Sequence, residues 1–117
     1  VIIIDYGYLN KPRNFTLQSV YNNKKTNIFD NIGKQDISSL VDFKKLIELG
    51  KMNNLDINIF CSQREFLLEY GIKERAKKIK AKANNKQKEE IELGLKRIIN
   101  GKNMGSLFKV LVLSKVK

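Results

Sequence analysis

Hydrophobic residues open the chain as an unbroken run, VIII at residues 1–4, and the polar sequence DYGY follows at residues 5–8. A continuous run of β-branched apolar residues is typical of a strand buried on both faces within a parallel sheet. Parallel neighbours are joined by crossover connections, so we expect further strands of the same sheet to precede residue 1. The pattern predicts the C-terminal part of a larger α/β domain.

A helix is predicted after a long polar segment. Residues 9–35 are mostly polar and contain the only proline, so we expect a long loop with one short extended segment. Ser38 or Ser39 is then expected to cap a helix over residues 43–52, where apolar residues recur at helical spacing. Asp42 would lie in the first turn of this helix, where the macrodipole favours a carboxylate.

The second half of the chain predicts a strand, a helical region and a final strand. Residues 55–60 alternate apolar and polar side chains, as a half-exposed strand does. Ser62 and Glu65 have the spacing of a capping box, and Gly71 is placed to end the helix that they begin. The remaining expected elements are helices at residues 72–83 and 87–100 and a strand at residues 107–113.

Composition limits the chemistry that the chain can perform. Its 117 residues are 42% hydrophobic, which is ordinary for one folded domain, and no apolar run approaches the length of about 20 residues that spans a bilayer. Histidine is absent and Cys61 is the only cysteine. The chain therefore has no internal disulfide and no Ser-His-Asp or Cys-His triad, and we expect no metal site.

The net charge of +11 is concentrated between Lys73 and Lys88, which contains eight basic residues. A basic stripe of this kind can bind nucleic acid or an acidic membrane surface. However, no aromatic residue interrupts it, so bases would have nothing to stack on. The chain is also rich in asparagine and isoleucine, as in genomes biased toward A and T, where exposed positions drift to lysine. We therefore favour a solvated face over a nucleic-acid partner.

Six short sequences, in this order, resemble the C-terminal end of a class I S-adenosylmethionine-dependent methyltransferase. More closely, they are similar to the MidA-like family, which includes the mitochondrial complex I assembly methyltransferase and its bacterial relatives. The sequences are IIDYGY (residues 3–8), TLQSV (16–20), DISSLVDF (36–43), SQREFL (62–67), GI (71–72) and MGSLFKVL (104–111). Together they extend over nearly the whole chain.

The resemblance implies an α/β fold in which the chain is the C-terminal portion of a Rossmann-like methyltransferase sheet. Residues 1–4, 55–60 and 107–113 would be its strands 5, 6 and 7, with the last strand antiparallel and inserted between the other two. Residues 1–117 would then be one part of a methyltransferase domain, and residues 72–100 a helical insertion. The glycine-rich loop that binds the cofactor belongs to earlier strands of the family, and no Gly-x-Gly occurs here.

The same resemblance implies a function for the full-length parent protein. It would use S-adenosyl-L-methionine to methylate an arginine of a protein, a subunit of respiratory complex I being the expected partner. The compartment would be a bacterial cytoplasm or the mitochondrial matrix. Leu40 departs from the family, which often has histidine there. This segment alone is expected to be inactive, and the alternative is a non-catalytic remnant or a partner-docking module.

The candidate site residues are Asp5, Tyr6, Gly7 and Tyr8, which follow a predicted strand. As a catalytic residue, Asp5 would orient an arginine guanidinium through a bidentate contact. Tyr6 and Tyr8 would wall the substrate pocket by stacking, and Gly7 would allow a close approach of the backbone. The alternative interpretation is structural: Asp5 caps the next turn, and the tyrosines cover the edge of the sheet. Asp42 is interpreted as a helix cap.

Overall fold

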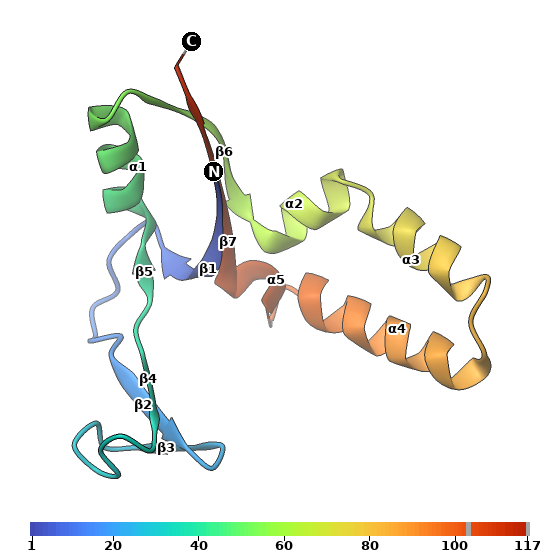
Figure 1. Cartoon of the computed structure of the whole chain (residues 1–117), viewed down its shortest axis with the longest axis horizontal. Coiled ribbons are helices and arrows are strands. Elements are labelled where there is room, and N and C mark those ends of the chain that lie inside the picture. The colour runs from blue at the N-terminus through green and yellow to red at the C-terminus, as the bar shows by residue number, and fades with distance from the viewer. Residues whose placement is uncertain (103, 117) are drawn as a thin grey trace.

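The computed structural model describes residues 1–102 and 104–116, which form a mixed sheet, a helix packed on it and two projecting arms (Figure 1). The sheet order is β5-β1-β7-β6, and β7 is antiparallel to both of its neighbours. The strands are β1 (Ile2–Tyr8), β5 (Val41–Asp42), β6 (Leu55–Ser62) and β7 (Phe108–Lys115). The expected α/β fold is confirmed, with the final strand between the other two.

Strand β1 is longer than expected, because it continues to Tyr8 instead of turning after Ile4. Most of the strand pairs with β7, and its last two residues pair in parallel with β5. Burial on both faces was expected within a larger domain, and in the described residues Ile2 is 60% and Ile4 46% exposed. Ile3 points to the other face and packs on the core. Only one face of β1 is therefore covered in the described chain.

The core lies between this face and helix α1 (Phe43–Met52). Phe43 and Leu111 are fully buried and Leu113 is nearly so. Apolar side chains around these three come from β1, β5, β6 and α1, namely Ile3, Val41, Leu46, Ile47, Leu55, Ile57 and Phe60. The helical spacing expected for residues 43–52 therefore corresponds to the buried stripe of α1.

Asp42, and neither Ser38 nor Ser39, caps helix α1. The backbone N–H of Lys45 donates to Oδ1 of Asp42 at 3.0 Å. The expected serine cap is wrong because Ser38 belongs to a strand, β4 (Asp36–Ser38), and two-residue β5 follows before the helix begins. The interpretation of Asp42 as a cap is confirmed.

One arm is a three-stranded sheet in a segment that was expected to be a long loop with one short extended stretch at residues 15–21, and that stretch contains the first of the three strands. The sheet has the order β3-β2-β4, with β2 at Gln18–Tyr21 and β3 at Lys24–Thr26. Asn22 and Asn23 join the first two strands with positive φ angles of 48° and 61°. Such angles suit a two-residue hairpin turn, and asparagine adopts them more readily than most residues.

The other arm is helical and extends away from the sheet (Figure 1). It consists of α2 (Gln63–Glu69), α3 (Ile72–Lys80), α4 (Asn85–Ile99) and the short α5 (Met104–Leu107). The predicted capping box of Ser62 and Glu65 is confirmed, as is Gly71, whose φ of 79° follows the end of α2. None of the described helices has the length and apolar character needed to cross a membrane.

Candidate functional site

The carboxyl ends of β1, β5 and β6 meet at one edge of the sheet, because these three strands run in the same direction. Ligand crevices of open α/β sheets lie beyond such an edge. Asp5–Tyr8 bring the predicted residues to it from β1, while Asp42 arrives from β5 and Ser62 from β6. Tyr8 and Asp42 are register partners although they are far apart in sequence.

Asp5 has an exposed side chain at this edge. Its Oδ1 accepts a hydrogen bond from the backbone N–H of Tyr6 at 2.7 Å, so the carboxylate is held close to the strand. Its register partner on β7 is Lys109, which is half-buried and donates from Nζ to the carbonyl of Ser106. The sequence carries no signal for this pairing until the strand register is known.

The two tyrosines make different contacts. Tyr6 packs against Phe108 with ring centroids 3.9 Å apart. Tyr8 lines a recess of about 250 Å³ with loop residues that include Pro12, Arg13 and Phe15. Tyr8, and not Tyr6, therefore borders a cavity in which a second molecule has room.

Gly7 lies where helix α1 approaches the strand most closely. A Cβ atom at this position would lie 2.4 Å from the Phe43 ring and 2.5 Å from the carbonyl oxygen of Val41. These distances are too short for any side chain to be accommodated without movement of the helix or of β5. The absence of a side chain at Gly7 is thus required by the packing of the core.

Cys61, Ser62 and Glu65 form a second group at the end of β6. Oε2 of Glu65 accepts hydrogen bonds from the Ser62 hydroxyl at 2.7 Å and from the Ser62 backbone N–H at 2.8 Å, which lower the pKa of Glu65. Burial raises the pKa of the Cys61 thiol, and the nearby Glu65 carboxylate raises it further. Cys61 is therefore a neutral thiol at physiological pH, which argues against a nucleophile.

Metal binding finds no support in residues 1–102 and 104–116, where no three His, Cys, Asp or Glu side chains gather closely enough to hold an ion. The edge of the sheet thus has the exposed carboxylates of Asp5 and Glu65, the rings of Tyr6 and Tyr8, and a recess. Carboxylates and aromatic rings are groups that can contact a cationic side chain.

Comparison with known families matches residues 1–61 to the family described as "Putative S-adenosyl-L-methionine-dependent methyltransferase". The match includes β1, β5, α1 and nearly all of β6. The chain belongs to this family. The methyl donor of the family is S-adenosyl-L-methionine.

Two crystal structures from Burkholderia thailandensis, described as members of one superfamily, resemble the chain closely. The first is of an uncharacterised protein, with 27% identity over 97% of this chain and a TM-score of 0.86. The second is described as a "likely methyl transferase" bound to S-adenosyl-homocysteine, with 27% identity over 97% of this chain and a TM-score of 0.82. The chain spans only 32% and 31% of the length of these two relatives.

The residues of this chain do not by themselves fit the methyl donor. Its seven glycines are never spaced as Gly-x-Gly, and β1 leads into Asp5, Tyr6 and Tyr8 instead of a glycine-rich turn before a helix. A side-chain-free turn is what lets a backbone approach a bound cofactor closely. No contact to the donor is therefore assigned to the chain's own candidate residues.

Proposed function

We propose that the full-length protein carrying this chain transfers a methyl group from S-adenosyl-L-methionine to an arginine side chain of a protein. By the family resemblance, the candidate acceptor is a subunit of respiratory complex I, in a bacterial cytoplasm or a mitochondrial matrix. Residues 1–117 are the C-terminal part of the catalytic domain in this proposal, and residues 72–100 are a helical arm inserted into it.

The observation that carries the proposal is the strand arrangement: the carboxyl ends of β5, β1 and β6 lie on the same side of the sheet, with antiparallel β7 between β1 and β6. Strand β1 carries Asp5 as well as Tyr8, and Tyr8 lines the recess. The same arrangement of elements occurs in a relative bound to S-adenosyl-homocysteine. Within the described residues, Asp5 is hydrogen bonded only at Oδ1. Its exposed carboxylate is suited to a guanidinium, which needs an acceptor for its paired N–H groups.

In the proposed mechanism Asp5 orients the acceptor nitrogen, and Tyr8 bounds the space that the acceptor side chain occupies. Methyl transfer is an in-line displacement, so the rate depends on how well the nitrogen is aligned. Tyr6 would help to hold β1 in position through its ring contact with Phe108. Gly7 would let the Phe43 ring pack directly against the strand. The chain's role is thus to hold and orient the acceptor.

The test is methyl transfer by the full-length protein from radiolabelled S-adenosyl-L-methionine to a complex I subunit that has been expressed without the enzyme. We expect Asp5→Asn to lower kcat/KM by about 100-fold, because an uncharged amide orients a guanidinium poorly. Asp56→Asn is the matched control, since Asp56 is an exposed residue near the opposite end of β6. We expect this variant to retain full activity.

Two outcomes would contradict the proposal. Equal activity of the Asp5→Asn variant and the wild type would remove Asp5 from the site. Failure of the intact gene product to transfer a methyl group to any arginine of the subunit would favour the non-catalytic, partner-docking alternative.

A further inference from the structure

Helices α3 and α4 form a hairpin whose far end is open. Near α2 the two helices enclose a smaller recess of about 180 Å³, in which Ala76 is 6% exposed and faces the apolar side of α4. Toward the connecting residues they separate around a notch of about 980 Å³. We call this the tip notch, and its lining includes Lys78, Ile79, Lys82, Ala83, Glu90 and Ile91.

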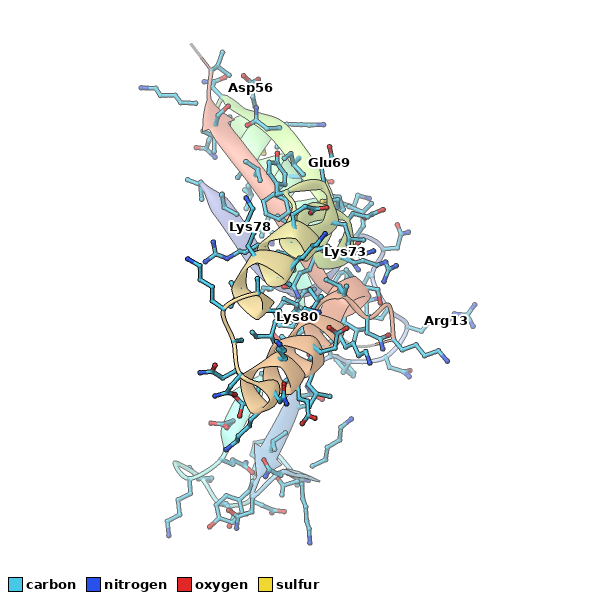
Figure 2. All side chains as sticks on the ribbon, turned by 90° about the vertical axis from the view of Figure 1, so that its right-hand side faces the viewer. Arg13, Asp56, Glu69, Lys73, Lys78 and Lys80 are labelled. Carbon is cyan, nitrogen blue, oxygen red and sulfur yellow. The ribbon has the colours of Figure 1, made fainter. Side chains whose placement is uncertain are left out.

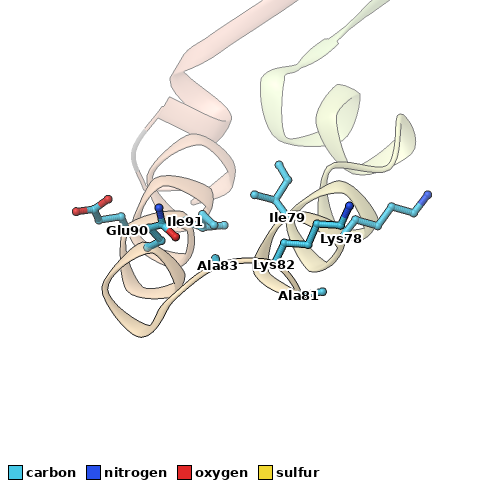
Figure 3. Close-up of a pocket in the computed structure, with 8 residues that line it drawn as sticks. Lys78, Ile79, Ala81, Lys82, Ala83, Glu90 and Ile91 are labelled. Carbon is cyan, nitrogen blue, oxygen red and sulfur yellow. The ribbon is translucent and has the colours of Figure 1, made fainter.

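The floor of the tip notch is apolar. Ile79 from α3 and Ile91 from α4 point into the gap from opposite sides, and Ala83 closes its end (Figure 3). Ile79 is 47% exposed. Burial of an isoleucine side chain is worth about 2 kcal/mol, so a concave floor of this kind favours an apolar group from another molecule.

The rim of the notch on the α3 side is positively charged. Lys78 and Lys82 are both exposed there, whereas Glu90 on α4 points away from them (Figure 3). Lys80 has a partner, because its Nζ lies 2.7 Å from Oε2 of Glu92, and this contact lowers the pKa of Glu92. Figure 2 shows the basic side chains of α3 extending outward over this surface.

The surrounding sequence strengthens this asymmetry. Residues 73–88 contain eight basic residues and one acidic residue. The lining itself contains Lys78, Lys82 and Glu90, so its charge is predominantly positive. A predominantly positive surface attracts acidic partners and repels basic ones. A second copy of this chain, with a net charge of +11, is therefore a poor occupant of the notch.

Nucleic acid and membrane are also less suitable occupants. Residues 72–99 contain no aromatic side chain on which a base could stack. Interfacial helices insert apolar side chains that protrude into the lipid, whereas Ile79 and Ile91 face each other across a recess. An apolar floor with a lysine rim instead matches an amphipathic helix that carries carboxylates beside its apolar stripe.

We propose that the tip notch binds an acidic amphipathic segment of a partner protein. The apolar side chains of that segment lie on Ile79 and Ile91, and its carboxylates pair with Lys78 and Lys82. The proposal stands on the hairpin alone and does not depend on the methyltransferase activity proposed above.

The test is fluorescence anisotropy with the full-length protein and a labelled synthetic helix of about 18 residues, or five turns, in which leucine forms one stripe and glutamate the rest. We expect saturable binding that weakens as salt is added, because salt screens exposed charge pairs. Lys78→Glu/Lys82→Glu should weaken binding at least about tenfold, since attraction becomes repulsion at the rim. Ile79→Gln should weaken peptide binding by a similar factor, because it removes an apolar contact from the floor of the notch.

Matched control variants distinguish binding at the tip notch from non-specific electrostatic or hydrophobic binding elsewhere on the chain. Lys24→Glu/Lys34→Glu makes the same charge change in the other arm, in β3 and in the turn before β4. Leu93→Gln replaces an exposed leucine of α4 outside the notch. Both controls should bind the peptide within about twofold of the wild type, because residues outside the interface contribute little to affinity. Circular dichroism of each variant verifies that the helices are retained.

Several results would overturn the proposal. One is that a peptide in which serine replaces leucine binds as tightly as the leucine–glutamate peptide, which would show that charge alone accounts for the binding. Another is unchanged affinity in the notch variants, or no saturable binding of the leucine–glutamate helix. Tighter binding of a DNA oligonucleotide or of phosphatidylserine vesicles, lost in the same notch variants, would assign the surface to nucleic acid or to membrane instead.

Discussion

Gly7 determines how closely α1 approaches β1. Residues Gly7 and Phe43 are far apart in sequence, yet a Cβ atom at Gly7 would lie 2.4 Å from the Phe43 ring. The sequence indicated only that the backbone near Gly7 is closely approached, and it did not identify Phe43 as the neighbour. Phe43 is fully buried, so it has no free space into which to move.

We expect Gly7→Ala to destabilise the protein by about 2 kcal/mol, because the added methyl group overpacks the core. Urea unfolding followed by circular dichroism measures the change. Gly94→Ala is the control, since a Cβ at Gly94 meets nothing within 4 Å and Gly94 lies within α4. That variant should gain up to about 1 kcal/mol from helix propensity. A Gly7→Ala variant as stable as the wild type would show that α1 is not held where the structure places it.

At the scale of the elements, helix starts were predictable when the cap and its partner are neighbours in sequence. The Ser62–Glu65 box was recognised from its spacing, and the structure contains both of its hydrogen bonds. The cap of α1 was misassigned because the competing strand β4 is recognisable only from its pairing with β2. The β2–β3 hairpin was missed for a similar reason, although Asn22 and Asn23 are good turn residues.

The capping box of α2 should respond to acid. Hydrogen bonds from Ser62 lower the folded-state pKa of Glu65, so the box stabilises the fold above the ordinary glutamate pKa. This contribution is lost as the pH falls through the folded-state value. In Ser62→Ala the pKa of Glu65 should rise toward its ordinary value, as measured by carboxyl-carbon NMR titration. Ser39→Ala, an exposed serine outside the box, should leave it unchanged. A Glu65 titration that is identical in all three proteins would show that the box is absent in solution.

At the scale of the whole molecule, one face of the sheet carries exposed apolar side chains. Ile2 and Ile4 lie on it beside Tyr6, and within the described residues most of β1 has a strand partner on one side only. Exposed strand edges and apolar patches promote association. The net charge of +11 makes copies of the chain repel one another. Added salt should increase association, because it screens this repulsion.

We expect the 117-residue polypeptide to self-associate with rising concentration and salt, as measured by sedimentation velocity. Ile2→Lys should reduce this association, because it places a charge on the exposed strand. Met52→Lys makes the same change at an exposed residue at the end of α1, away from the sheet face, and should have a much smaller effect. A wild-type chain that stays monomeric in high salt would contradict this prediction.

The sequence by itself determined most helices, two of the three long strands and the α2 cap, because those features depend on residues within one or two turns of each other. It also indicated a strand at the start of the chain but ended it before Asp5, which the structure places inside β1. The tertiary structure decided the features that join distant segments. These are the packing of Phe43 over Gly7, the pairing of Asp5 with Lys109, and the notch between Ile79 and Ile91. Each depends on strand register or helix packing, which bring together residues whose separation in sequence carries no local signal.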